Sequence, residues 1–315
     1  MTGRSHLPMG EGQEFDAIRR LLSVWGSHAE DIGDDAAVLD IPAGERLVVS
    51  TDASVEHVHF RREWLTAPEI GARATAAALS DLAAMGAVPR GLLVALALPE
   101  AWRADLEAIA AGVGEAAAAA GCPIVGGNIT ASDALSLTIT VLGSSVHPVR
   151  RSGAVPGDSV VVTGVLGGPG AALRALLAGE VPRVDHRDRF ARPVPRLVEA
   201  RWLAEHGARA AIDISDGLLA DAEHLARASG VSIEIDSALL PCVRGVQANA
   251  AATSGEEYEL LVCVPPDMCA LAGEFESHFG VRLTCIGKVC TAGAEPVRML
   301  GMAPGGPRGH DHLRQ

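Results

Sequence analysis

Aspartates at predicted turns and strand ends are the residues of this sequence best suited to chemistry. Gly33-Asp34-Asp35 places two carboxylates on a tight turn before a predicted strand. Ser50-Thr51-Asp52 ends the next predicted strand with two hydroxyls and a carboxylate, at the edge where α/β folds place ligands. Oxygen donors of this kind suit hard cations. A lone Asp-Asp turn is usually a solvated turn or a cap, and the strand-end motif is as compatible with a cap as with a ligand site, so a metal site is predicted only from several such motifs together.

Two further aspartate motifs lie in a predicted helix and at a predicted strand-to-helix junction. Asp81 is embedded in the apolar stretch Leu79-Ser80-Asp81-Leu82, where burying an unpaired carboxylate would cost on the order of several kcal/mol. We therefore expect Asp81 to meet a metal ion or a network of donors. Asp213-Ile214-Ser215-Asp216-Gly217 runs from a strand into a helix start, where Ser215 or Asp216 could bind a ligand or simply cap the helix.

Glycine-rich and basic segments are candidates for phosphate binding. The glycines of Gly126-Gly127-Asn128, predicted as a turn, would let backbone amides approach a phosphate closely. Gly167-Gly168-Pro169-Gly170 precedes a predicted helix and could hold an anion at its N-terminus, although it lacks the Gly-Lys-Ser/Thr ending of a P-loop. The pair Arg150-Arg151 could reach phosphate oxygens or be merely solvated. His57 and His59 share a face if the preceding strand continues, yet such a pair is more often structural than metal-binding.

The acidic balance and the near absence of lysine argue against several classes of function. The chain of 315 residues has a formal charge of −13, which disfavours binding to nucleic acid and to anionic membranes. It contains a single lysine, Lys288, so a mechanism that depends on a phosphate-binding or Schiff-base lysine is not expected. An anionic substrate would therefore need metal ions beside it.

Cysteine spacing and hydropathy bear on the location of the protein. The six cysteines form no C-x-x-C pair and show no zinc-ligand spacing, which predicts a reduced, cytoplasmic protein without a disulfide framework. No apolar run approaches the roughly 18 residues that a membrane helix needs. The N-terminal segment lacks the apolar stretch of a signal peptide. We therefore expect neither secretion nor membrane insertion.

Hydrophobic periodicity and turn residues predict alternating helices and strands in two regions. The first region is predicted to contain helices over 14–25, 68–85 and 101–120, and strands over 36–39, 46–51, 91–98 and 135–143. The segment 147–156, rich in arginine, proline and glycine, indicates a domain junction. The second region is predicted to contain a strand from 159, helices after 168 and 193, a strand ending at 213, a helix from 217, and strands near 231 and 257. Because aromatic residues are only 3% of the chain, both cores are expected to consist of small aliphatic side chains in α/β layers.

Taken in order, these motifs resemble those of the thiamine-monophosphate kinase family, in the superfamily that also contains aminoimidazole ribonucleotide synthetase. The resemblance spans nearly the whole chain, and its strongest segments are 12–15, 32–38, 50–52 with His59-Phe60, 79–87, 151–153, 212–218 and 256–260. It implies an α/β fold of the α+β type in two domains. Residues 1–148 would bind metal and ATP and form a sheet or barrel with a second copy across a homodimer. Residues 149–315 would close the active-site cleft.

The resemblance also implies roles for individual residues. The expected ligands of several Mg²⁺ ions are Asp34, Asp35, Ser50, Thr51, Asp52, Asp81, Asn128, Asp213 and Asp216. The expected nucleotide-binding residues are Gly126, Gly127, Asn128, Arg151 and Ser215, and the expected substrate-binding residues are His59, Glu256 and His310. Catalytic roles fall to Asp34, Asp216 and Arg151. ATP would donate its γ-phosphate directly in line to thiamine monophosphate, without a covalent enzyme intermediate.

Three departures from the family pattern leave alternatives open. Asn128 stands where the family has an aspartate, which removes one negative charge from the expected metal site. Ser254 and Glu257 are milder changes in the family's Gly-Gly-Glu-Asp-Tyr-Glu-Leu motif. His310 replaces an aromatic residue that is expected to stack on the substrate. The alternatives are a diverged relative that uses ATP on another small substrate, and a catalytically silent nucleotide-binding dimer.

Overall fold

The computed structural model of the chain describes residues 12–30, 32–301 and 309. By its internal contacts the chain divides into two compact units. The first unit comprises Met1–Leu82 with Ala87–Val146, and the second comprises Ala83–Gly86 with His147–Gln315. Among the described residues, no helix is both long and apolar enough to cross a membrane.

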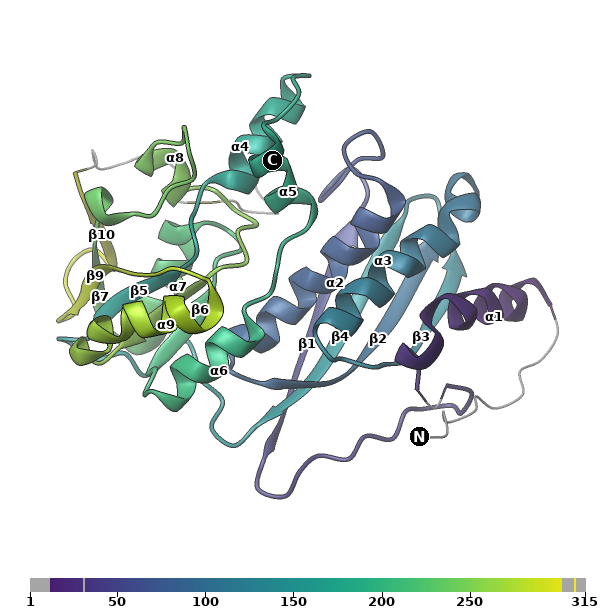
Figure 1. The fold of residues 1–315 in the computed structure, drawn as a ribbon, viewed down its shortest axis with the longest axis horizontal. Helices are drawn as coiled ribbons and strands as arrows, with labels where there is room; N and C mark the ends of the chain where they lie inside the picture. The colour runs from purple at the N-terminus through teal and green to yellow at the C-terminus, as the bar shows by residue number, and fades with distance from the viewer. Residues whose placement is uncertain (1–11, 31, 302–308, 310–315) are drawn as a thin grey trace. The chain divides into compact units, whose positions relative to one another are not determined.

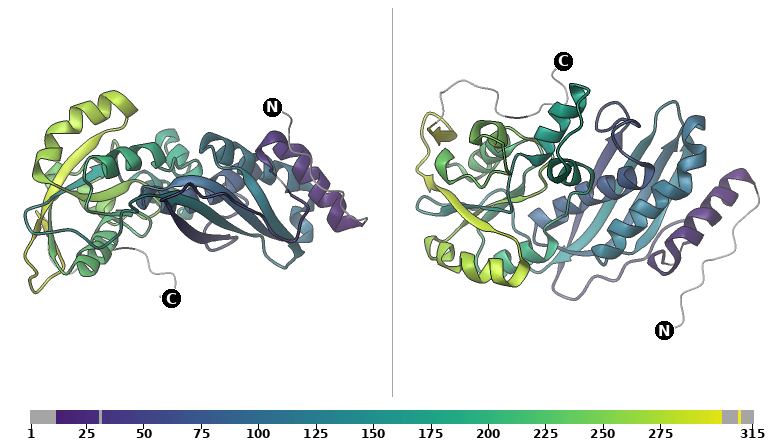
Figure 2. Two further views of the ribbon diagram at one scale, coloured as in Figure 1. Left: turned by 90° about the horizontal axis from the view of Figure 1, so that it is seen from below. Right: turned by 45° about the horizontal axis from the view of Figure 1, so that its top comes forward.

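The first unit is a four-stranded sheet with helices packed on one face (Figure 1, Figure 2). Its strands are β1 (Arg46–Val55), β2 (Val88–Leu98), β3 (Ile124–Ala131) and β4 (Ser136–Ser145), in the order β1-β4-β2-β3. Its helices are α1 (Gln13–Trp25), α2 (Ala67–Ala84) and α3 (Leu106–Ala119), with short 3-10 helices η1 (Gly26–His28) and η2 (Glu100–Asp105). Strands β2 and β3 are parallel, and β4 pairs antiparallel with both β1 and β2. Strands β1 and β3 are therefore the two edges of this sheet.

Small residues allow the helices of the first unit to pack closely. A side chain added at Gly112 of α3 would put its Cβ 1.9 Å from the carbonyl oxygen of Pro68, and one at Gly71 of α2 would lie 2.1 Å from the carbonyl oxygen of Ile109. Helix α1 is held on α3 by Trp25, whose indole nitrogen donates to the carbonyl oxygen of Ala110 at 2.9 Å. The small residues of these helices thus allow their backbones to pack in direct contact, without large interlocking side chains between them.

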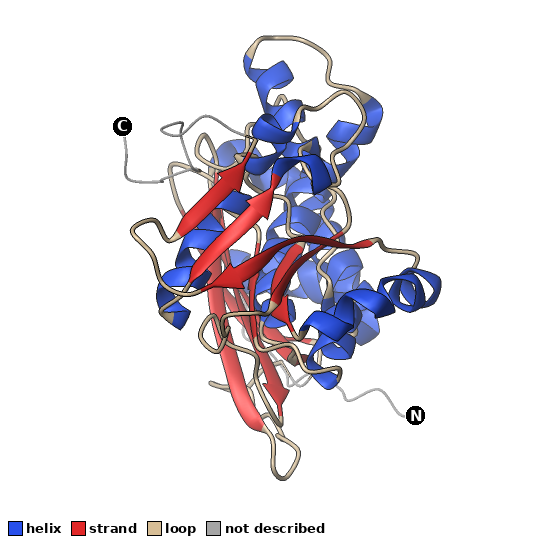
Figure 3. Cartoon of the chain, turned by 90° about the vertical axis from the view of Figure 1, so that its left-hand side faces the viewer, coloured by secondary structure: helices blue, strands red, loops and turns tan. Residues whose placement is uncertain are grey.

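The second unit contains a six-stranded mixed sheet (Figure 3). Its strands are β5 (Ser159–Thr163), β6 (Ala210–Asp213), β7 (Ser232–Asp236), β8 (Leu260–Val264), β9 (Leu283–Cys290) and β10 (Val297–Leu300), in the order β10-β7-β9-β5-β8-β6. Its helices are α4 (Gly168–Leu177), α5 (Val184–Ala191), α6 (Leu197–Glu205), α7 (Leu218–Ser229), α8 (Ala248–Ala252) and α9 (Ala272–Phe279), with 3-10 helices η3 (Ser237–Leu239) and η4 (Pro266–Leu271). Helix α7 packs on β6 and β7 and covers the main aliphatic core.

Most of the predicted elements are confirmed. Helices α1 and α2 and strands β1, β2 and β4 lie within a few residues of the predicted ranges. Strand β6 ends at Asp213, and α7 begins directly after Gly217, as the sequence of this junction predicts. The mixed α/β character of both regions is therefore confirmed.

Several details differ from the prediction for identifiable reasons. The strand predicted over 36–39 is wrong, because this segment finds no strand partner and Val38 is 89% exposed. The predicted turn at Gly126-Gly127-Asn128 is also wrong, because these residues belong to β3. At Gly127 an added Cβ would lie 2.0 Å from the carbonyl oxygen of Val94, so glycine serves close pairing with β2 rather than a turn.

Other differences concern where elements begin. The helix predicted over 101–120 starts as the 3-10 helix η2 and becomes α-helical only at Leu106. The strand predicted near Glu257 begins at Leu260, because Glu256 and Tyr258 adopt left-handed backbone angles, with φ of 60° and 51°. Helix α5, which is polar over most of its length, was not predicted.

Replacing Gly112 by alanine should destabilise the first unit. The new Cβ would meet rigid backbone of α2, so the two helices must separate, at a cost of about 2 kcal/mol in the free energy of unfolding. Denaturant unfolding of the variant measures this cost. Gly273 of α9 is the matched control, because its added Cβ meets nothing within 4 Å, and alanine there should be neutral or slightly stabilising. Equal effects of the two substitutions would contradict the close-packing argument.

Candidate functional site

Ser50, Asp52 and Asp81 share one side of the first unit's sheet. Ser50 and Asp52 are two residues apart on β1, so their side chains point to the same face. That face is the one covered by α2, because the Ser50 hydroxyl donates to Oδ2 of Asp81 at 2.5 Å. Asp81 therefore meets the donor expected for a carboxylate in an apolar helix. All three side chains are partly buried.

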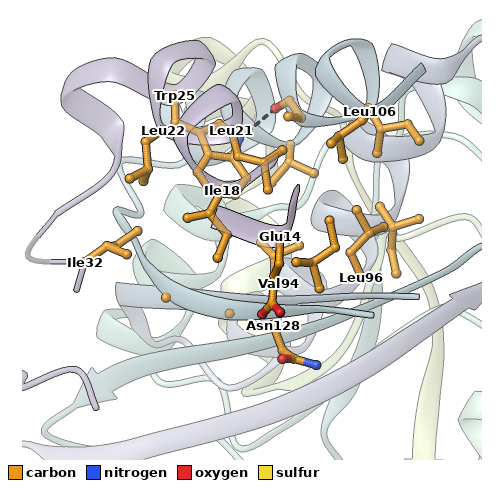
Figure 4. A pocket seen from close by; sticks show the side chains of 17 residues that line it. Glu14, Ile18, Leu21, Leu22, Trp25, Ile32, Val94, Leu96, Leu106 and Asn128 are labelled. Atoms are coloured by element: carbon orange, nitrogen blue, oxygen red, sulfur yellow. Dashed lines mark hydrogen bonds between the residues drawn. The ribbon is translucent and has the colours of Figure 1, made fainter. Parts of the chain in front are cut away.

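Thr51 and Asn128 lie on the opposite, open face of the same sheet. The hydroxyl of Thr51 lies 3.0 Å from that of Thr140 on β4. Asn128 pairs with the exposed Ala95, and Figure 4 shows its amide pointing away from the helices that cover the other face. The structure thus does not bring Asn128 together with Asp52 and Asp81.

The acidic turn that carries Asp34 and Asp35 is exposed. It follows a segment in which Ala29 forms a bridge with Ile124 and the amide of Glu30 donates to the carbonyl oxygen of Ile124 at 2.9 Å. The chain therefore enters this turn beside β3, whereas Asp52 belongs to β1 at the other edge of the sheet.

His59 is held by backbone groups in the turn after β1. Its Nδ1 accepts a hydrogen bond from the amide of Val55 at 3.1 Å, and its carbonyl oxygen accepts one from Arg73 at 3.2 Å. The strand ends at Val55, and His57 has a left-handed backbone with φ of 68°. The shared face predicted for the two histidines is therefore not formed.

In the second unit, Asp221 organises the predicted ligand loop 213–217. Its Oδ2 accepts hydrogen bonds from the amides of Ser215 and Asp216, each at 3.1 Å, and of Gly217 at 3.0 Å. Asp213, at the end of β6, is also buried. The sequence analysis did not single out Asp221, because Glu223 and His224 follow it and the stretch is less apolar than the one around Asp81.

Burial raises the pKa of Asp221 to about 8, and the negative charges of Asp213 and Asp216 add to this rise. The amides of Gly217 and Asp216 act in the opposite direction, because they stabilise the carboxylate. The negative charges of this loop thus disfavour the ionised form of Asp221.

Ser215 and Glu256 are brought together by backbone pairing. The amide of Glu256 donates to the carbonyl oxygen of Ser215 at 2.7 Å, and the amide of Tyr258 donates to that of Ile214 at 2.9 Å. An added Cβ at Gly255 would lie 2.8 Å from the carbonyl oxygen of Ser215. The predicted nucleotide-binding and substrate-binding segments of this unit are therefore neighbours.

Arg151 lies in an exposed segment that is fixed at its backbone. Its carbonyl oxygen accepts a hydrogen bond from the hydroxyl of Ser229, at the end of α7, at 3.0 Å. The same hydroxyl accepts from the amides of Gly153 and Ala154 at 3.2 Å. The backbone that carries the Arg151 guanidinium group is therefore fixed.

The C-terminal end of the chain reaches this loop through Gly309. An added Cβ there would lie 2.7 Å from the carbonyl oxygen of Asp216 and 2.6 Å from Cβ of Ala220. His310, predicted to bind substrate, lies outside the described residues.

The glycine-rich start of α4 already holds anionic and polar groups of the protein itself. Oε1 of Glu257 accepts a hydrogen bond from the amide of Gly167 at 2.6 Å, and the hydroxyl of Ser254 accepts one from the amide of Gly170 at 3.0 Å. Glu257 is only 6% exposed, and burial raises its pKa to about 8. The two amides that were candidates for binding an external anion are thus used internally.

An apolar pocket of roughly 130 Å³ lies between α1, α3 and the sheet of the first unit (Figure 4). Leucine, isoleucine and valine side chains form most of its wall, and Figure 4 shows Ile18 pointing from α1 into it. Its polar lining comes from Glu14 and from the segment 126–128 of β3. The pocket could accept a flat, largely apolar group next to the glycines that were predicted to bind nucleotide.

Across residues 12–30, 32–301 and 309, no three side chains of His, Cys, Asp or Glu are grouped closely enough to hold a metal ion. Within either unit, the predicted ligands therefore do not form one preformed metal centre.

Both parts of the chain match the same protein family. The family described as AIR synthase related protein, N-terminal domain, matches residues 33–145, and its C-terminal domain counterpart matches residues 155–298.

Similar proteins cover nearly the full length of the chain. A thiamine-monophosphate kinase from Methanopyrus kandleri is 37% identical over 298 residues, which are 91% of each chain. The crystal structure of thiamine-monophosphate kinase from Stenotrophomonas maltophilia K279a has a TM-score of 0.82 at 33% identity, over 92% of this chain and 97% of that chain. A structure of AaThiL complexed with AMPPCP and TMP has a TM-score of 0.75 at 32% identity, over 94% of each chain.

Replacing Glu257 by glutamine should remove part of the pH dependence of stability. A carboxyl group whose pKa is about 8 when folded, against an ordinary value of 4.5, stabilises the fold at low pH and loses this contribution as the pH rises towards 8. The free energy of unfolding of the variant, relative to the original chain, should therefore rise between pH 5 and 8, by up to about 1.4 kcal/mol per pH unit.

Denaturant unfolding at several pH values measures this difference. Glutamine at the exposed Glu180 is the control and should leave the two pH profiles parallel. Parallel profiles for E257Q as well would show that Glu257 is ionised in the folded protein.

Proposed function

We propose that this chain transfers the γ-phosphate of ATP to thiamine monophosphate, because it belongs to the thiamine-monophosphate kinase family of AIR synthase related proteins. The products are thiamine diphosphate and ADP. The observation that carries this proposal is the similarity, over 94% of both chains, to the structure complexed with AMPPCP and TMP. AMPPCP is an ATP analogue, so that structure combines a nucleotide of the donor class with a phosphate monoester of the acceptor class.

The reaction needs positioning of two anions more than it needs an activated side chain. A phosphate oxygen of thiamine monophosphate forms a bond to the γ-phosphorus, while the bond from that phosphorus to the β–γ bridging oxygen breaks and ADP leaves. The attacking oxygen is already anionic, so no general base is required. A chain with one lysine, Lys288, which pairs with Glu234 at 3.2 Å, fits a mechanism in which cations other than lysine offset the charge.

Mg²⁺ is the cation that the donor groups fit. One face of the first unit's sheet carries oxygen donors from Ser50, Asp52 and Asp81. The exposed turn before β1 carries two further carboxylates, Asp34 and Asp35. Oxygen donors of this kind are the ligands that Mg²⁺ prefers. When bound, Mg²⁺ would neutralise phosphate charge.

The second unit is proposed to contribute ligands from its loop 213–217. The repulsion among Asp213, Asp216 and Asp221, which contributes to the raised pKa of Asp221, is the kind of strain that a bound cation relieves. Ser215 and Arg151 are proposed to contact the nucleotide, and Glu256 the acceptor. Catalytic roles are proposed for Asp34, Asp216 and Arg151.

The apolar pocket of the first unit is proposed to receive the adenine of ATP. An aliphatic wall suits a flat base, and Glu14 could accept a hydrogen bond from its exocyclic amine. Gly126 and Gly127 at the pocket floor leave backbone close to whatever occupies it.

We also propose a homodimer and a cytoplasmic location. Leu47 and Val49 on the edge strand β1 are each more than half exposed, which would be explained by a second copy covering this strand. All six cysteines are free, as is usual in a reducing compartment. We propose that residues 1–148 and 149–315 are the two functional domains.

Purified protein with ATP, Mg²⁺ and thiamine monophosphate should form thiamine diphosphate and ADP, measured by chromatography. Substituting Asp81 by asparagine should lower kcat/KM by about 100-fold and raise the Mg²⁺ concentration needed for half-maximal rate, since a proposed ligand charge is lost. Asn at the exposed Asp133 is the control and should leave both unchanged. Absence of thiamine diphosphate at every Mg²⁺ concentration would refute the proposed function and leave a different acceptor, or silent ATP binding, as the explanation.

Filling the pocket should affect the nucleotide and not the acceptor. We expect I18W to raise the KM for ATP by at least about tenfold, with the KM for thiamine monophosphate unchanged, because the larger ring occupies the proposed adenine position. Initial rates at varied concentrations of each substrate measure this. V24W, on the outer side of the same helix, should leave both constants unchanged. A larger effect of I18W on the acceptor would place a different group in the pocket.

A further inference from the structure

We propose that Asp221 is a positioning residue for phosphoryl transfer, which fixes the backbone of 215–217 so that Ser215 and Asp216 face their ligands. This inference rests on the proposed function. Asp221 itself would contact neither substrate nor metal.

The hydrogen bonds of Asp221 leave the loop little freedom. One oxygen, Oδ2, accepts from three consecutive amides, those of Ser215, Asp216 and Gly217, at distances from 3.0 to 3.1 Å. Asp221 is 1% exposed and lies in the first turn of α7. Its own position is fixed by the helix, since its amide donates to the carbonyl oxygen of Gly217 at 2.9 Å.

The need for an aspartate at this position follows from Gly217. A helix start is usually capped by a side chain at the residue before the first turn, but Gly217 has no side chain. Its φ of 127° and the backbone of Thr253, 3.2 Å from an added Cβ, disfavour any larger residue there. The carboxylate of Asp221, reaching back from within the first turn, therefore performs the capping.

Backbone hydrogen bonds hold the other side of the loop. The carbonyl oxygens of Ile214 and Ser215 accept from the amides of Tyr258 and Glu256. These bonds fix the start of the loop, whereas Asp221 fixes the part that carries Asp216 into the helix. Removing the Asp221 carboxylate should therefore release Asp216 in particular.

The test compares D221A, D221N and D158A. D221A should exchange the amide hydrogens of 215–217 at least about tenfold faster, need more Mg²⁺, and lose about 100-fold in kcat, as a misplaced ligand predicts. D221N keeps an oxygen acceptor for the three amides and should recover most of the exchange protection and activity. If D221A does not fold, D221E, which displaces the acceptor by one methylene, is measured in its place.

D158A is the matched control for a structural effect. Asp158 is also a fully buried carboxylate of the second unit, which accepts from Arg209 at 2.7 Å and from the amide of Val155 at 2.9 Å, away from the loop. It should lose stability without faster exchange at 215–217 and without a change in Mg²⁺ requirement. Equal exchange and equal Mg²⁺ dependence in D221A and D158A would overturn the proposal. Amide exchange needs no turnover, so it tests Asp221 even if the original chain fails to phosphorylate thiamine monophosphate.

Discussion

Buried carboxylates paired with backbone amides are the interaction on which the second unit depends. Asp221 joins its helix to the loop 215–217, and Glu257 joins its own segment to the start of α4. Between them, backbone bonds connect Ile214 with Tyr258, so one continuous set of contacts runs from α4 to α7. These amides only partly offset the effect of burial, which raises the pKa of each carboxyl group to about 8.

A buried ion pair completes this set of contacts. Glu259 accepts two hydrogen bonds from Arg196, at 2.6 and 2.7 Å, and a third from the hydroxyl of Thr163 at 2.7 Å. Its partner is an arginine whose own burial is offset by that carboxylate. Tyr258, between Glu257 and Glu259, has a left-handed backbone with φ of 51°, and its amide donates to the carbonyl oxygen of Ile214.

The fold could be predicted from sequence where local patterns decide the structure. The periodicity of 14–25 and the strand-to-helix junction at Asp213–Gly217 required no knowledge of distant residues. The segment 36–39 was mistaken for a strand because alternation says nothing about the availability of a partner strand. Gly127 was mistaken for a turn residue because its real constraint is the carbonyl group of Val94, which is distant in sequence.

The candidate site was predictable in its residue types and not in its arrangement. Asp52 and Asp81 share a face because the Ser50 hydroxyl of β1 donates to Asp81 of α2, whereas the chain enters the turn of Asp34 beside β3, and sheet order is not encoded in any single motif. Asp221 was harder to find than Asp81, because Glu223 and His224 follow it in the same helix and make that stretch look solvated.

The side chain of Asn128 and the apolar pocket lie on opposite faces of β3 (Figure 4). Gly126 and Gly127 line the apolar pocket, and an added Cβ at Gly127 would meet the carbonyl oxygen of Val94. Asn128 projects from the other face (Figure 4), so its side chain does not shape that pocket. Its neutral amide therefore affects the open face of the sheet and not the apolar pocket.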